Sequence, residues 1–195
     1  MKEKEEKFKL VIPTEKYKRK AIKYIKEHNR HKSEINGSGF LYMYLKDYKG
    51  WLQRLDTERK KEATATEVPT ETFFLVRLND DKIIGMVNIR TKTNEKVKNS
   101  FGNIGYGIRP KEREKGYNKI NLYLALVECQ KFGLKQVIIS CKKENVASAK
   151  TMIALGAKYD REVFNSSQNA IVEFYRIDVD YAVEAYKSTY EKYIG

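Results

Sequence analysis

The sequence predicts one α/β (α+β) domain in which a mixed, mostly antiparallel twisted sheet is flanked by helices. Residues 72–78 and 82–90 read as a β-hairpin, and residues 102–141 read as a strand, a basic turn, a long helix and a second strand. Residues 158–164 and 170–178 read as a closing antiparallel pair. With 195 residues, the chain can bury one core without help from disulfides or metals.

The N-terminal part is predicted to be mainly helical. Residues 8–13 indicate a short strand that ends at Pro13, and Thr14 is expected to cap a helix that reaches about His28. The glycine-rich segment 36–39 indicates a flexible break, after which residues 40–55 are expected to form a second helix.

The middle of the chain is predicted to be extended. Residues 56–70 read as a polar linker that leads into the first hairpin strand, and residues 79–81 supply the hairpin turn. Residues 91–101 are a polar excursion from which the chain returns to the strand 102–109.

The most informative segment lies between that strand and the next. Basic residues in a turn that ends at Gly116 precede a helix expected over 116–132, with Gly133 after its end, and a strand expected over 137–140. Such a turn leaves backbone N–H groups unpaired at a helix N-terminus, where the helix dipole favours an anion. The pattern therefore predicts a phosphate-binding loop.

The segment Arg113-x-x-Gly116-x-Asn118 resembles the R/Q-x-x-G-x-G/A pyrophosphate loop of the GNAT superfamily of acyl-CoA-dependent N-acyltransferases. The resemblance covers the order of elements over residues 72–164. It also includes Cys141 to Lys150, a strand end followed by Asn145-Val-Ala-Ser148 and a helix. Asn118 differs from the family pattern, which has Gly or Ala at that position.

This resemblance implies a sheet whose two central strands splay apart, with acetyl-CoA bound between residues 102–109 and 136–141 as co-substrate. It implies the following cofactor-binding residues: Ile108, Arg109, Arg113, Glu114, Lys115, Gly116, Tyr117, Asn118, Asn145, Ser148 and Lys150. Other interpretations stay open for several of them. Asn145 also fits an N-cap, Ser148 and Lys150 also fit a helix surface, and Arg109 and Arg113 also fit surface charges.

The expected catalytic residues lie on the strand 102–109. A backbone N–H near Gly107 or Ile108 is the candidate for holding the oxyanion, and Tyr106 is the candidate hydroxyl. No Asp or Glu occurs between residues 101 and 109, so the base is expected to be a water chain ending at Tyr106 or a carboxylate such as Glu173. Met152 stands where many family members place a proton-donating tyrosine.

The predicted function is transfer of an acetyl group from acetyl-CoA to a primary amine of a small molecule or a protein. The alternatives are a catalytically silent acyl-CoA-binding protein and a basic nucleic-acid-binding module. The net charge of +13 is the reason to consider a nucleic-acid-binding module. However, tyrosines and a tryptophan recur at roughly helical spacing in the first 70 residues, which favours a core face there. Nucleic acid is therefore an unlikely partner.

The remaining expectations concern organisation and location. Residues 1–7 are expected to be a charged tail, 8–178 the acyltransferase domain, and 179–195 an amphipathic C-terminal helix packed on it. Without a signal peptide or a long apolar run, the chain is expected to be cytoplasmic and without a membrane partner, and homodimer formation is left open. Cys129 and Cys141 have no nearby histidines in sequence, so no metal site is expected.

Overall fold

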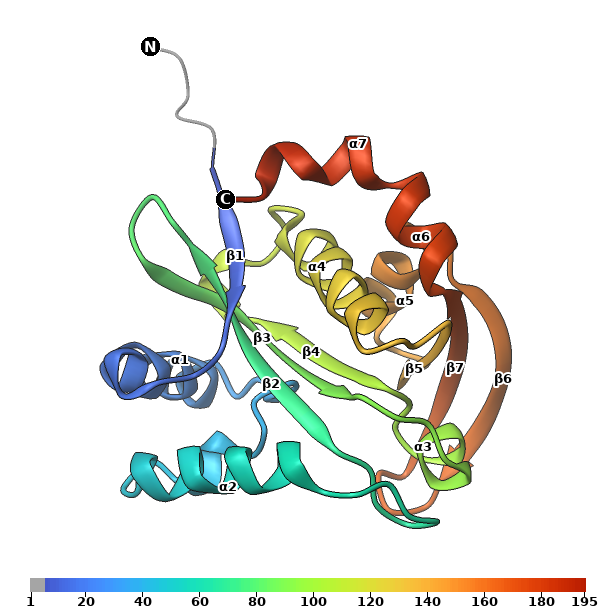
Figure 1. The fold of residues 1–195 in the computed structure, drawn as a ribbon, viewed down its shortest axis with the longest axis horizontal. Coiled ribbons are helices and arrows are strands. Elements are labelled where there is room, and N and C mark those ends of the chain that lie inside the picture. The colour runs from blue at the N-terminus through green and yellow to red at the C-terminus, as the bar shows by residue number, and fades with distance from the viewer. Residues whose placement is uncertain (1–5) are drawn as a thin grey trace.

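The computed structural model, which describes residues 6–195, contains two antiparallel sheets (Figure 1). The first sheet has the order β1-β2-β3-β4 and the second the order β5-β7-β6. The strands of the first are β1 (Phe8–Val11), β2 (Thr70–Arg77), β3 (Lys82–Arg90) and β4 (Ile104–Ile108); those of the second are β5 (Gln136–Lys142), β6 (Lys158–Asn165) and β7 (Ala170–Asp178). The α/β fold class is confirmed, whereas most of the predicted 1–7 tail lies outside the described residues.

Helices cover both faces of the first sheet (Figure 1). On one face lie α1 (Lys18–Arg30) and α2 (Tyr48–Lys60), and on the other lies α4 (Tyr117–Lys131), followed along the chain by α5 (Val146–Ile153), α6 (Val179–Ala185) and α7 (Lys187–Tyr190). A short helix, α3 (Glu95–Asn99), precedes β4, and single 3-10 turns occupy Glu15–Tyr17, Leu41–Met43, Pro110–Glu112 and Glu191–Tyr193.

Strand alternation divides the core into two layers. On β2, Phe74 and Val76 face the cluster formed with α1 and α2, in which the rings of Trp51 and Phe74 stack at 5.9 Å. Phe73 and Leu75 face the larger cluster under α4. Because side chains of a strand point to alternate faces, one apolar run can supply both layers.

Several predicted boundaries were wrong, each for a local reason. The second helix begins at Tyr48 and not at residue 40, because Phe40 has a left-handed φ of 63° and Asp47 caps the helix through the N–H of Gly50 (2.9 Å). Thr14 makes no side-chain cap, and a 3-10 turn separates it from α1. The predicted helix after residue 180 is broken into α6, α7 and a 3-10 turn.

The two sheets meet at Asn103, which is fully buried. Its Oδ1 accepts a hydrogen bond from the N–H of Ile138 (3.0 Å), its own N–H donates to the Ile138 carbonyl (2.5 Å), and its Nδ2 donates to Thr93 Oγ1 (2.8 Å). Beyond this junction no ladder joins β4 to β5 in the described structure. The two strands therefore separate toward Ile108 and Lys142.

No helix within residues 6–195 combines the length and the apolar character needed to cross a bilayer. The cysteines Cys129 and Cys141 are buried and free. Within the same residues, no group of three or more His, Cys, Asp or Glu side chains is placed to hold a metal ion.

Candidate active site

The loop before α4 presents a run of unpaired backbone donors. Glu114 and Gly116 have left-handed φ values of 64° and 79°, which turn the chain twice before the helix begins at Tyr117. The N–H groups from Glu114 to Asn118 donate no hydrogen bond to any part of the chain that the structure describes. Together with the positive end of the helix dipole, these donors make the loop suited to a phosphate or pyrophosphate.

Gly116 leaves open space at the start of this helix. An added Cβ there would meet no atom within 4 Å, so the space in front of the loop is free for a ligand. Gly133 stands at the opposite end of α4 with nearly the same φ, 76°, and equally open surroundings. The two glycines thus share a backbone conformation, but only Gly116 belongs to the loop of unpaired donors.

A buried carboxylate supports the loop from behind. Glu112, with a side chain only 5% exposed, is ion-paired with Lys82, with Lys115 (2.8 Å) and with Arg77 (3.4 Å). Burial alone would raise the pKa of Glu112, but the donors of Lys115 and Lys82 outweigh it and lower the pKa to about 2. Lys115 is therefore partly engaged in holding the loop.

The two arginines near Pro110 have different roles. The Arg109 guanidinium is buried, where it pairs with Glu27 (2.5 Å) and donates to the Ile83 carbonyl (3.0 Å). This placement argues against the phosphate contact expected for the Arg109 side chain, because each of its nitrogens already has a protein acceptor. Arg113 instead donates to the Ile108 carbonyl (3.1 Å) and to Ser33 Oγ (2.6 Å) beside the loop.

Two further predicted loop residues are anchored by their side chains. Tyr117 packs its ring on Phe8 at 5.0 Å and donates to Glu6 (2.5 Å), so only its backbone is available to a ligand at the loop. The Asn118 Oδ1 atom is buried without a partner, while its Nδ2 lies 3.4 Å from Thr151 Oγ1. This buried oxygen is an acceptor, which an ionised phosphate without hydrogens cannot use.

A cleft of about 680 Å³ lies between the diverging strands. It is lined by β4, by the end of β5, by the start of the α5 segment, by the loop 33–42 and by the loop that joins β6 to β7. Tyr106, Cys141, Asn145 and Ser148 all line it. The structure therefore brings predicted residues from two distant segments to one cavity.

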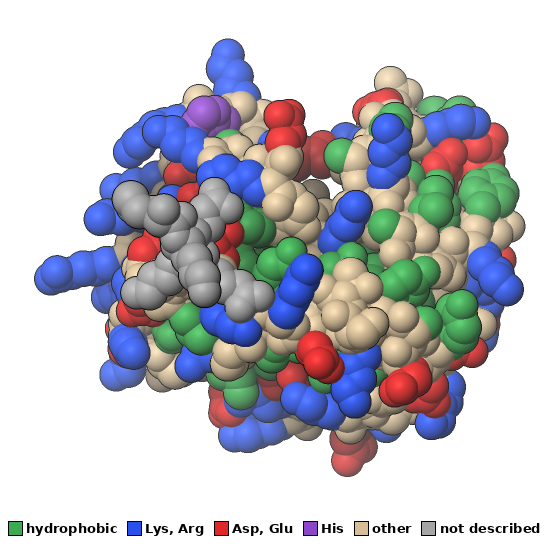
Figure 2. All heavy atoms as spheres, turned by 90° about the horizontal axis from the view of Figure 1, so that it is seen from above, with side chains coloured by type: hydrophobic (Ala, Val, Ile, Leu, Met, Phe, Trp, Pro, Cys, Tyr) green, Lys and Arg blue, Asp and Glu red, His purple; other side chains and the backbone are tan. Residues whose placement is uncertain are grey.

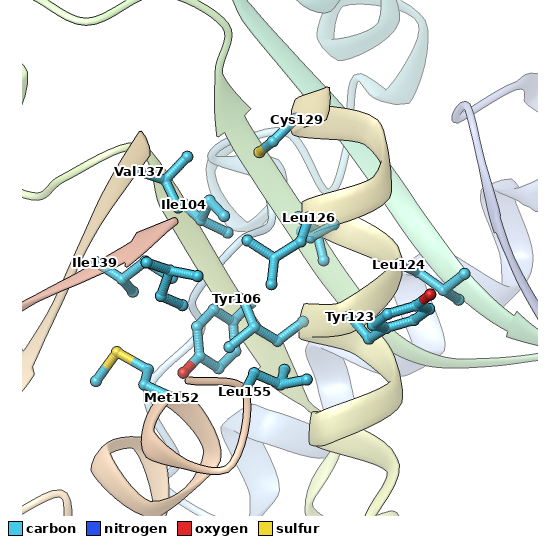
Figure 3. Packing of buried hydrophobic residues seen from close by; sticks show 14 of the residues in the cluster. Ile104, Tyr106, Tyr123, Leu124, Leu126, Cys129, Val137, Ile139, Met152 and Leu155 are labelled. Atoms are coloured by element: carbon cyan, nitrogen blue, oxygen red, sulfur yellow. The ribbon is translucent and has the colours of Figure 1, made fainter. Parts of the chain in front are cut away.

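Two hydroxyls meet in this cleft. The Tyr106 hydroxyl lies 3.0 Å from Ser148 Oγ, and burial raises the pKa of Tyr106 well above its ordinary value. Figure 3 shows the Tyr106 ring pointing from β4 toward Met152 on α5 and Leu155 just after it. Met152 itself is fully buried in the core. A hydroxyl pair from β4 and α5 thus lies close to the position where many relatives have a tyrosine.

The backbone of β4 turns alternate N–H groups toward the cleft. Arg109 N–H donates to the Ile84 carbonyl of β3 (3.0 Å), and Gly107 is paired with Met86 in the same ladder. Because donors alternate between the two edges of a strand, the N–H groups of Tyr106 and Ile108 point to the edge that faces β5. Of the two residues expected to hold the oxyanion, Ile108 therefore turns its N–H toward the β5 side and Gly107 turns its N–H toward β3.

The remaining predicted residues have mixed placements. Asn145 caps α5 by accepting from the Ser148 N–H (3.1 Å), as the alternative interpretation expected, and it also lines the cleft. Lys150 is exposed on the same helix. Glu173 lies on β7 beside Cys141, where it accepts from the Tyr175 hydroxyl (2.7 Å), and it does not line the cleft.

Sequence reasoning missed the loop 33–42 as part of this site. The loop lies over the glycines of β4: a Cβ on Gly37 would lie 2.7 Å from the Gly105 carbonyl, and one on Gly107 would lie 3.3 Å from the Asn36 carbonyl. Glu34 then pairs with Lys142 at the end of β5 (2.6 Å), which ties the loop across the cleft. The glycines in 36–39 and 105–107 were the sequence signal that could have indicated this contact, because they allow the two backbones to approach closely.

Residues 21–158 match the family model described as the acetyltransferase (GNAT) domain. The sequence matches none of the curated proteins.

Solved structures share the fold at low identity. The microcin C7 self-immunity acetyltransferase MccE, solved with acetyl-CoA and AMP, is 18% identical, with a TM-score of 0.65 over 88% of this chain and 92% of that one. The ribosomal-protein-S5-alanine acetyltransferase of Vibrio fischeri is 18% identical, with a TM-score of 0.67 over 92% and 96%. The spermidine/spermine N-acetyltransferase SpeG of Vibrio cholerae is 13% identical, with a TM-score of 0.63 over 92% and 98%.

Proposed function

Since the chain belongs to the GNAT family of acetyl-CoA-dependent acetyltransferases, we propose that it acetylates a primary amine of a small molecule or of a protein. The observation that carries the proposal is the run of unpaired N–H groups from Glu114 to Asn118 at the start of α4, beside the cleft that opens between β4 and β5. Family members compared above act on ribosomal protein or on polyamines.

The loop residues would hold the pyrophosphate of acetyl-CoA mainly through their backbone. Gly116 permits close approach, and Arg113 and Lys115 add positive charge. Farther along, Ile108 at the end of β4 and the segment from Asn145, which lines the cleft, would border the pantetheine arm.

Bound acetyl-CoA supplies an acetyl thioester, whose carbonyl carbon the amine nitrogen attacks while the carbon–sulfur bond breaks. The N–H of Ile108 would stabilise negative charge on the carbonyl oxygen. The amine proton leaves to water in the cleft, because Glu173 does not reach it and Glu34, the carboxylate that lines it, is paired with Lys142.

The leaving sulfur requires a proton. The Tyr106 and Ser148 hydroxyls line the cleft as a bonded pair, so they would donate to the sulfur while taking a proton in turn from solvent. The Tyr106 hydroxyl is protonated at neutral pH, but burial raises its pKa and makes it a weaker acid, so it would donate to the sulfur only while it takes a proton in turn through Ser148.

The C-terminal segment is proposed to be an appended part of the same domain. Residues 8–178 would form the acyltransferase domain, and residues 179–195 pack on α4, where Tyr123 donates to the Val183 carbonyl (3.1 Å) and stacks on Tyr190 at 4.9 Å. Cytoplasmic location and homodimer formation stay predictions from the sequence.

The test combines binding and turnover. Acetyl-CoA at about 100 times its dissociation constant should raise the free energy of unfolding by about 2.7 kcal/mol, measured by thermal denaturation. An amine screen with saturating acetyl-CoA, read by mass spectrometry, should then yield an acetylated product. Absence of a thermal shift at millimolar acetyl-CoA would contradict the proposal, whereas a shift without any product would favour the silent binding protein.

A further inference from the structure

One charged side chain of the cleft lacks a counter-ion. The charged residues that line the cleft are Glu34, Lys142 and Arg90, and the first two neutralise each other in an ion pair of 2.6 Å. Arg90, at the end of β3, forms no ion pair with any carboxylate of residues 6–195. The cleft therefore carries one uncompensated positive charge.

The Arg90 side chain is held in place without being neutralised. Its Nη1 donates to the Gly102 carbonyl (3.1 Å), and its guanidinium lies 5.8 Å from the centre of the Phe101 ring. Its Nε and Nη2 atoms have no acceptor among the described residues. The guanidinium is thus oriented by the protein while part of its donor fork stays free for a ligand.

Burial makes this unpaired charge costly. Desolvation lowers the pKa of Arg90, and no nearby carboxylate counteracts it. A bound oxyanion would offset this cost, because it neutralises the guanidinium and accepts the hydrogen bonds that the protein leaves unmade.

Arg90 lies at the end of the cleft that is opposite to the phosphate loop. Its backbone N–H donates to Asn103, just before β4 begins, whereas the loop of residues 113–118 follows the end of β4. At about 3.4 Å per residue, the strand separates the two positions by roughly 17 Å. A thioester bound near the middle of β4 would have the cofactor phosphates on one side and Arg90 on the other.

Exposed aromatic side chains border the same cleft. Phe101, Phe40 and Tyr42 are 54%, 50% and 45% exposed, although they are large and apolar, and all three line it. Such rings favour a ligand with an apolar or planar part.

We propose that the amine acceptor carries an oxyanion, a carboxylate or a phosphate, which Arg90 binds while the aromatic side chains of the cleft contact an apolar part of the same molecule. This inference rests on the proposed function, because it names the substrate class of that same site. It also implies that polyamines, which carry only positive charge, are poor acceptors.

The first test compares matched products, so that amine basicity plays no part. In the presence of CoA, N-acetylphenylalanine should bind about 10- to 100-fold more tightly than N-acetylphenylalaninamide by calorimetry. The acetylated form of phosphoethanolamine, compared with N-acetylethanolamine, tests phosphate in the same way. The arm with the larger ratio identifies the oxyanion, and ratios near one in both arms would overturn the proposal.

The second test uses variants of the arginine. Arg90→Gln should bring the binding ratio close to one, and Arg90→Lys should retain part of it. The matched control is Arg176→Gln, because Arg176 lies on β7, is paired with Asp160 and does not line the cleft. A ratio that survives Arg90→Gln would exclude Arg90 as the anion site.

The outcomes separate this inference from the proposed function. If wild-type protein acetylates neutral amines or polyamines faster than phenylalanine and phosphoethanolamine, acetyl transfer stands and the oxyanion proposal fails. If no amine is acetylated, the proposed function fails, while the product-binding ratios still decide whether Arg90 selects an oxyanion.

Discussion

Tyr106 combines a packed ring with a hydroxyl that reaches Ser148, 42 positions later in the sequence. If this pair relays a proton to the leaving sulfur, Tyr106→Phe should lower kcat by roughly 10²- to 10⁴-fold, because it removes the hydroxyl and preserves the ring. Stopped assays with saturating acetyl-CoA measure this effect. An unchanged kcat, with unchanged thermal stability, would leave water as the only proton source.

Met152 provides the contrasting residue. Its side chain is fully buried against the same core, and a thioether cannot donate a proton. Met152→Leu conserves volume, so kcat should stay within a few-fold of wild type and the free energy of unfolding should change by less than about 1.5 kcal/mol. A large loss of kcat in a stably folded Met152→Leu protein would show that the active site depends on this position.

For single residues, the sequence predicted backbone features better than the partners of charged side chains. Gly116 was predicted from the basic turn that it ends and from the loop motif, both of which are local in sequence. Arg109 was expected to contact phosphate because it flanks Pro110 at a strand-to-helix turn, yet Glu27 pairs with it from 82 positions away. Arg90 was missed for the converse reason, since only the folded structure shows that it has no carboxylate beside it.

The two ends of α4 allow a matched test of the phosphate loop. Gly116→Ala and Gly133→Ala each place a Cβ on a residue with φ near 80°, which costs roughly 1–2 kcal/mol in stability in either case. Only Gly116→Ala adds that Cβ beside the unpaired N–H groups, so it alone should weaken acetyl-CoA binding, by at least about tenfold. Equal affinities of the two variants, measured by calorimetry, would refute the loop assignment.

The support under that loop should depend on pH. The pKa of Glu112 is about 2 in the folded protein, below its ordinary value of 4.5, so its stabilising effect is complete above about pH 4.5 and is lost as the pH falls toward 2. The shift corresponds to a contribution on the order of 3 kcal/mol. Glu112→Gln should therefore lower the melting temperature at pH 7, and the difference from wild type should shrink below pH 4.5. A constant difference across this range would contradict the ion-pair explanation.

Elements with strong periodicity were predicted well, and those set by tertiary contacts were not. The hairpin of β2 and β3 and the helix α4 lie within two residues of their predicted bounds, because apolar pattern and turn residues agree there. The segment 40–47 has aromatic residues at helical spacing, yet its regular structure is limited to the 3-10 turn Leu41–Met43, and Trp51 Nε1 on α2 fixes the chain just before it by donating to the Gly39 carbonyl (2.8 Å). A tertiary hydrogen bond of this kind has no counterpart in the periodicity of the sequence.

For the whole molecule, Asn103 is the residue that joins the two sheets. Asn103→Ala would leave the Ile138 N–H buried without an acceptor, and it should lower the free energy of unfolding by about 2–3 kcal/mol. Hydrogen exchange at Ile138 should accelerate more than exchange in the β2–β3 hairpin. Uniform acceleration across both sheets would argue against a local junction.

The surface charge fits a dispersed arrangement better than a nucleic-acid groove. Figure 2 shows Lys and Arg side chains interspersed with acidic ones over the face it presents, and α2 carries i,i+3 and i,i+4 ion pairs. We therefore expect duplex DNA at low salt to give no salt-dependent association in fluorescence anisotropy. Binding that falls steeply with salt would restore the alternative.

The junction at Asn103 acts as a hinge between β4 and β5, which are joined there and separate toward their other ends. Strands fixed at one end and free at the other convert a small rotation into a larger opening: over the roughly 17 Å length of β4, a rotation of about 3° moves the far end by about 1 Å. The far end is where the phosphate loop and the Glu34–Lys142 ion pair lie. A ligand can therefore enter by flexing the gap at its free end while the hydrogen bonds at its closed end stay intact.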